Sequence, residues 1–150
     1  MQIYLVFAFI HVLAVISAVG ANATYQFWYG RAGLDRDRLL WTIENVSLLD
    51  RRIANPSYAV AFVAGILTVL TGPYSFETLW IAAAIALYIV LALIGALLAA
   101  PAMRRRRELA MADPASAAYA AAASRSRMLA GLSFALVLVI LVLMVFKPTI

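Results

Sequence analysis

His11 is the single histidine of this 150-residue chain, and it lies in a long run of apolar residues. An imidazole in such a place can ligate a metal, relay a proton, or form a hydrogen bond that fixes how two helices meet. Arg51 and Arg52, beside Asp50, are weaker candidates, because a guanidinium group can bind an anionic group through two parallel hydrogen bonds. Two arginines at the mouth of a membrane span more often act as topology anchors.

Other kinds of chemistry find little support in the sequence. The chain has no cysteine, so it offers no disulfide, thiolate metal site or catalytic thiol. Transition-metal transport needs several converging ligands, and we expect none of the methionines to lie at the depth of His11. No pair of carboxylates falls within an apolar run, which argues against hydrolysis. The residues leave open whether the protein is an enzyme.

The distribution of charge is typical of a multi-pass membrane protein. Hydrophobic residues make up 66% of the chain and charged residues 13%, and the mean hydropathy is +0.96. Four stretches carry no charge: those before Arg31, between Arg52 and Glu77, between Glu77 and Arg104, and between Arg127 and Lys147. Each can cross a hydrocarbon layer about 30 Å thick. We therefore expect one integral membrane domain, 1–150, with spans at residues 2–28, 56–72, 76–100 and 128–146.

The basic residues set the expected topology. Of the twelve Lys and Arg, five lie in segment 31–54 and six in segment 101–127, which leaves only Lys147 elsewhere. The positive-inside rule places both segments in the cytoplasm and both termini on the other side. The basic pI is then a topology signal rather than a sign of nucleic-acid binding. The first apolar run ends in Ala21-Asn22-Ala23 but has no basic start, so we expect a retained span instead of a signal peptide.

The expected fold is an all-α membrane four-helix bundle with cytoplasmic helical extensions. Five apolar residues at helical spacing predict a short amphipathic helix between spans one and two: Leu39, Ile43, Val46, Leu49 and Ile53. This helix either lies along the membrane surface or continues a span. Helix starts are expected at Asn55-Pro56, at Ser75 and at Asp113-Pro114, the last beginning a long helix to Phe146.

Small residues are expected to set how the helices pack, because lipid tails are as apolar as leucine. They are Ala14, Ala18 and Ala21 in span one, Ala61 and Gly65 in span two, and Ala92, Ala96 and Ala99 in span three. Span four has few small residues and is expected to face lipid or a partner subunit. We expect the His11 imidazole, about 12 Å inside the bilayer, to bond Thr68, Tyr88 or a backbone carbonyl.

Short motifs along the whole chain resemble a bacterial family of predicted four-span integral membrane proteins of unknown function. They are "FIHVLAVISAVG", "LLDRRIANPSYAV", a Gly-Pro turn followed by Trp80, "PAMRRR" and "LMVFKP". That family is related to the copper-resistance D type proteins and to the haem-containing bacterial protoporphyrinogen oxidase. The resemblance implies that His11 matches a haem-linked histidine and that Asp50, Arg51, Arg52 and Pro56 match a run at span two. With no second histidine, the haem would need His11 from two subunits, or its iron would be five-coordinate.

Two functions stay open at this point. The first is a small redox-active protein of the bacterial inner membrane that binds haem b through His11, as a homo-oligomer. The second is a non-enzymatic subunit of a larger membrane complex, which docks a partner through its cytoplasmic helices and span four. In the second case His11 serves only to fix helix register.

Overall fold

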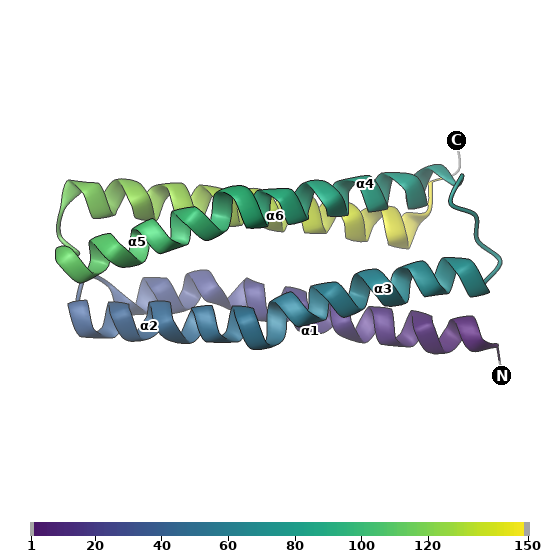
Figure 1. Ribbon diagram of the computed structural model, residues 1–150, viewed down its shortest axis with the longest axis horizontal. Helices are drawn as coiled ribbons and strands as arrows, with labels where there is room; N and C mark the ends of the chain where they lie inside the picture. Colours follow the sequence, from purple (N-terminus) through teal and green to yellow (C-terminus); the bar gives the residue numbers. More distant parts are fainter. Residues whose placement is uncertain (1, 149–150) are drawn as a thin grey trace.

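The computed structural model describes residues 2–148, and within this range the chain is entirely α-helical, as expected from its sequence. Four long rods run side by side (Figure 1). The first rod is α1 (Ile3–Ala32), and the fourth is α6 (Ala117–Phe146). The second rod consists of α2 (Arg36–Leu49), the π-helical turn η1 (Asp50–Ala54) and α3 (Asn55–Thr71). The third consists of α4 (Leu79–Ile94), the π-helical turn η2 (Gly95–Ala99) and α5 (Ala100–Ala112).

All four rods are long and apolar enough to cross a membrane, with 30, 36, 34 and 30 residues. The described residues thus form as many membrane-length helices as the sequence has charge-free stretches, as expected. The rods alternate in direction, so both termini and the link 72–78 lie at one end, which we name the terminal end (Figure 1). The links 33–35 and 113–116, with α2 and α5, lie at the opposite end, which we name the basic end.

The rods form two helix pairs. In one, α1 packs along the whole α2–η1–α3 rod; in the other, α6 packs along the α4–η2–α5 rod (Figure 1). The pairs meet where α1 contacts α6 and where α2 contacts α5. A site that joins α1 to α6 therefore also joins the two halves of the molecule.

The amphipathic helix expected at the start of the second rod forms as α2, and it continues span two. Leu39, Ile43 and Val46 are buried, and the chain stays helical from α2 through η1 into α3. The apolar face of α2 packs against protein at the basic end, which removes the reason for it to lie along a lipid surface.

Prolines explain the two π-helical turns. Pro56 follows η1 and Pro101 follows η2. A proline has no N–H to donate within the helix and its ring crowds the carbonyl four residues back, so a locally widened turn relieves the clash. The expectation that Asn55 caps a new helix is wrong. Its side-chain amide donates instead to Asp50 Oδ2 (3.1 Å), inside a continuous rod.

Two other helix starts lie three residues later than expected. The Ser75 hydroxyl accepts a hydrogen bond from the Glu77 N–H (3.2 Å) within a turn, and α4 begins at Leu79. Likewise Asp113 accepts from the Ala115 N–H (2.9 Å), whereas the N-cap of α6 is Ser116, which accepts from the Tyr119 N–H (3.1 Å). In both links a Ser or Asp side chain stabilises the turn before the helix rather than its first turn.

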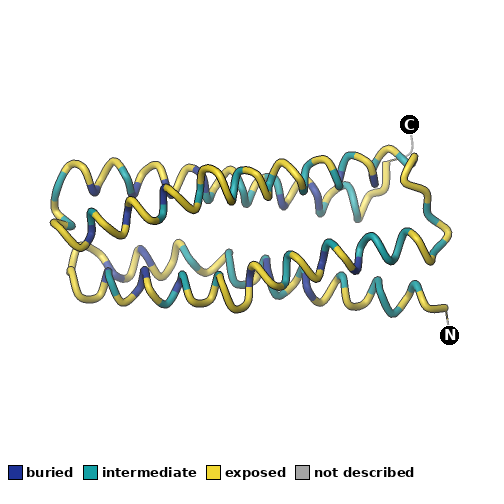
Figure 2. The backbone as a smooth tube through the Cα atoms, viewed as in Figure 1, coloured by how far each residue is buried: buried dark blue, intermediate teal, exposed yellow. Residues whose placement is uncertain are grey.

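Buried residues differ between the two ends (Figure 2). The basic end has a core of larger side chains: Tyr29, Ala32, Leu39, Ile43, Val46, Ala110, Tyr119 and Ala123. Toward the terminal end most buried residues are alanines, among them Ala14, Ala18, Ala61, Ala64 and Ala84. Small residues thus bring the spans together, as expected for α1 and α3. The stripe expected on the third rod is wrong, because Ala92 and Ala96 are exposed.

Candidate functional site

The His11 imidazole bridges α1 and α3. Its Nδ1 atom lies 2.6 Å from the main-chain oxygen of Ala61. A carbonyl oxygen can only accept, so Nδ1 carries a proton and donates it to this bond. The hydrogen bond fixes both the tautomer and the orientation of the ring.

Gly65 provides the space for this ring. A Cβ atom at Gly65 would lie 2.9 Å from His11 Nδ1 and 3.1 Å from Cε1, which is closer than normal packing allows. Gly65 follows Ala61 by four residues, so both lie on the face of α3 that contacts α1. The pair that the sequence indicates as a packing motif therefore forms the seat of the imidazole.

The other ring nitrogen faces α6. His11 Nε2 lies 3.4 Å from the sulfur of Met144, which belongs to the opposite helix pair. The expectation that no methionine lies at the depth of His11 is therefore wrong. At the terminal end α1 extends beyond the end of α6 (Figure 1). The last turn of α6 therefore contacts His11, eight residues after the start of α1, rather than the first residues of that helix.

The side chains of Thr68 and Tyr88, expected as partners of His11, bond elsewhere. The Thr68 hydroxyl donates to the Ala64 carbonyl oxygen of its own helix (2.8 Å). The Tyr88 hydroxyl donates to the Tyr58 carbonyl oxygen (3.1 Å), which links α4 to α3. Of the three expected kinds of partner, the backbone carbonyl is the one that holds His11.

Arg51 and Arg52 lie away from this site. Both are exposed, and Arg51 Nε donates to the Ser47 carbonyl oxygen (3.2 Å) one turn earlier. Arg52 precedes Ala61 by nine residues, or about 14 Å along the rod. The structure does not bring these arginines together with the imidazole.

A second polar centre, at the basic end, was not recognised in the sequence. Arg106 on α5 is only 3% exposed, and its guanidinium carbon lies 3.9 Å from the centre of the Tyr29 ring on α1. It donates to Ser126 Oγ (3.2 Å) and to the Tyr119 hydroxyl (3.4 Å), both on α6. Within residues 2–148 no carboxylate lies within ion-pair distance of it.

The spacing of small residues in the sequence nevertheless indicates that Arg106 faces inward. The run of four arginines reads as a solvated block, but Ala102 and Ala110 lie four residues to either side of Arg106. Such spacing places all three on one helix face, and the structure buries all three. Which of the four arginines turns inward thus follows from the alanines that flank it.

The sequence of this chain matches, over residues 5–148, the family described as "Predicted integral membrane protein (DUF2269)". The chain belongs to this family. It is therefore an integral membrane protein, and the apolar rods are its multi-pass membrane region. No curated protein and no solved structure matches it. The relation to copper-resistance D type proteins and to protoporphyrinogen oxidase stays a prediction.

In this DUF2269 protein, the His11 site has two atoms that could bind a metal, the Nε2 nitrogen of His11 and the sulfur of Met144. Residues 2–148 contain no group of three or more His, Cys, Asp or Glu residues that could hold a metal ion. A nitrogen and a thioether sulfur that face each other are, by contrast, a donor pair found on haem iron. The Arg106 centre connects helices through tyrosine rings and hydroxyls, while its buried Nε atom has no hydrogen-bond partner among residues 2–148.

Proposed function

We propose that this DUF2269 protein binds a b-type haem in the membrane, with His11 and Met144 as the two iron ligands. The observation that supports the proposal is the orientation of the imidazole. Its Nδ1 is held by the Ala61 carbonyl oxygen while its Nε2 faces the sulfur of Met144, 3.4 Å away. Ligating histidines characteristically donate their second ring N–H to a carbonyl or carboxylate, which orients the ring and raises its basicity.

The donor set fits haem iron, because an imidazole nitrogen and a thioether sulfur are both known haem ligands. His11 and Met144 belong to different helix pairs, so the iron would be held between the two pairs. A ligand from each helix pair also removes the need for His11 from two subunits.

The chemistry that haem would supply is one-electron transfer, at a potential that a methionine ligand raises. The chain would hold the iron through His11 and Met144 and surround it with apolar side chains that exclude water. Arg51 and Arg52 are better placed as anchors at the membrane surface than as partners of this group.

A second function has its own support. His11 Nδ1 is bonded to the Ala61 carbonyl oxygen and Nε2 contacts the Met144 sulfur, so the imidazole can simply hold α1, α3 and α6 together. In that case the chain is a non-enzymatic subunit or scaffold, and its α2–α5 end and the exposed side of α6 would contact a partner.

Absorbance spectroscopy separates the two. Purified in mild detergent, a haem protein is red and shows a Soret band, which we expect to be lost in His11→Ala and altered in Met144→Ala. Met128→Ala is the matched control, because Met128 lies on the same helix and is 67% exposed. A colourless protein that takes up no added haemin would refute the proposal; co-purification with another membrane protein would then favour a subunit role.

We also infer that the basic end faces the cytoplasm of a bacterium and that both termini lie outside it, across the inner membrane. The inference rests on the eleven arginines of the basic segments against the single Lys147 near the terminal end. Assembly into a homo-oligomer or a larger complex is part of the same proposal.

A further inference from the structure

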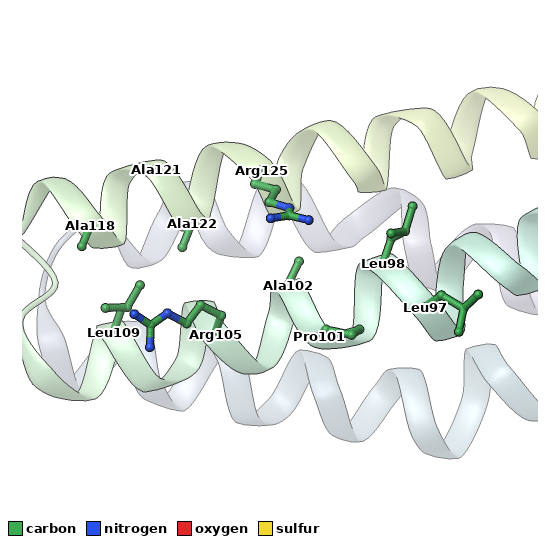
Figure 3. A pocket seen from close by; sticks show the side chains of 10 residues that line it. All are labelled: Leu97, Leu98, Pro101, Ala102, Arg105, Leu109, Ala118, Ala121, Ala122 and Arg125. Carbon is green, nitrogen blue, oxygen red and sulfur yellow. The ribbon is translucent and has the colours of Figure 1, made fainter.

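A groove between α5 and α6 lies on the side of the molecule, near the limit of the apolar region (Figure 3). Its volume is about 470 Å³. Alanines form the α6 wall at positions 118, 121 and 122, and the space exists because these side chains are small. Leu97, Leu98 and Pro101 line the part nearer the terminal end, and Arg105 and Arg125 lie farther toward the basic end.

The two arginines lie at the level where lipid headgroups begin. Arg104 is the first charged residue after Glu77, and Arg127 is the last before Lys147. Arg105 and Arg125 are within two residues of these limits, or about 3 Å along a helix. The groove therefore crosses from the hydrocarbon region into the headgroup region.

Both arginines are free to bind an anion. Arg125 has no ion-pair partner within residues 2–148, and Figure 3 shows its side chain reaching from α6 toward Ala102 on α5. Arg105 Nη1 lies 3.4 Å from Glu108 Oε2, but these side chains are 66% and 60% exposed. An exposed pair of this kind contributes little free energy, so a phosphate can displace it.

We propose that this groove binds an anionic phospholipid. Its phosphate would lie between Arg105 and Arg125 and one acyl chain along Leu97 and Leu98, which are 66% and 43% exposed. A free phosphate would use the arginines but leave the apolar part uncovered, whereas a zwitterionic lipid would cover the leucines without neutralising the arginines. Basic pockets between spanning helices bind anionic headgroups by this combination. The proposal is independent of haem binding.

The test is native mass spectrometry of the protein in detergent, titrated with phosphatidylglycerol. We expect Arg105→Gln/Arg125→Gln to weaken phosphatidylglycerol binding about 30-fold. The control Arg104→Gln/Arg127→Gln removes the same charge at the same level from residues outside the groove, and should bind nearly as the unchanged protein does. Equal loss in both variants would overturn the proposal, because it would show general attraction to a basic surface.

A second pair of variants tests the space in the groove without changing charge. Ala122→Leu fills the groove beside Arg105, where the headgroup would lie, and should weaken binding, whereas Ala120→Leu, at an exposed position outside it, should not. Phosphatidylcholine with the same acyl chains should bind much more weakly, and excess inorganic phosphate should not displace the lipid. Equal binding of phosphatidylcholine, displacement by phosphate, or no effect of Ala122→Leu would each refute a site for an anionic lipid.

Discussion

At the scale of single residues, the His11 site depends on a missing side chain. The imidazole can approach the Ala61 carbonyl only because position 65 has no Cβ. Overpacking a closely packed contact forces side chains out of their preferred rotamers or moves the backbone. Gly65 is therefore as much part of the site as the ligand atoms are.

We expect Gly65→Ala to lower the free energy of unfolding by about 1–3 kcal/mol, because the new methyl group collides with the imidazole. The measurement is unfolding in a detergent titration followed by circular dichroism. In a His11→Ala background the same substitution should cost little, since the colliding ring is gone. Gly131→Ala is the control, because a Cβ there meets nothing within 4 Å. A loss of similar size with and without His11 would contradict this account.

At the scale of elements, Arg106 connects three helices at the basic end. It belongs to α5, packs on a ring of α1 and donates to hydroxyls of α6. A buried cation without a carboxylate is costly unless hydrogen bonds and aromatic faces offset its desolvation. The planar guanidinium group can stack and donate at once, which lysine cannot.

Arg106→Ala should destabilise the protein by about 2–3 kcal/mol, because it leaves hydroxyls of α6 and the face of Tyr29 without their partner. Arg106→Lys should restore only part of this, and Arg104→Ala, at an exposed position, should change stability by less than about 0.5 kcal/mol. Thermal unfolding of all three variants gives the comparison. If Arg106→Met is as stable as the unchanged protein, the buried cation is not a stabilising connection.

At the scale of the whole molecule, the two helix pairs are joined differently at the two ends. The basic end has a core of tyrosine and aliphatic side chains, whereas in the apolar region the two pairs meet at the His11–Met144 contact and at the hydrogen bond from Tyr88 to Tyr58. Large side chains buried between helices stabilise the basic end, while small residues allow close backbone approach within lipid.

Topology is the whole-molecule property most open to a direct test. A reporter active only in the cytoplasm should be inactive when fused after residue 150 and active when inserted at the 113–116 link. A reporter active only outside should give the opposite pattern. The same activity at both positions would contradict a rod that crosses the membrane between them, and reversed activities would invert the inferred orientation.

The spans and the all-helical class followed from the sequence alone. Charged groups are so costly in hydrocarbon that the stretches without them, from Arg52 to Glu77 for example, identify the spans without any knowledge of packing. The small pair Ala61 and Gly65 was also visible as a helix contact. The faces that α2 and Arg106 bury could be inferred from helical spacing.

Only the tertiary structure brought Met144 to His11 and placed Tyr29 and the hydroxyls of α6 around Arg106. Both contacts depend on how far each rod is shifted along its neighbours. They also depend on how the wider turns η1 and η2 rotate the helix faces that follow them. Hydrophobicity does not set these shifts, because one apolar face suits lipid as well as another. They are fixed by side-chain packing and hydrogen bonds between residues as distant as 11 and 144, which no local pattern in the sequence encodes.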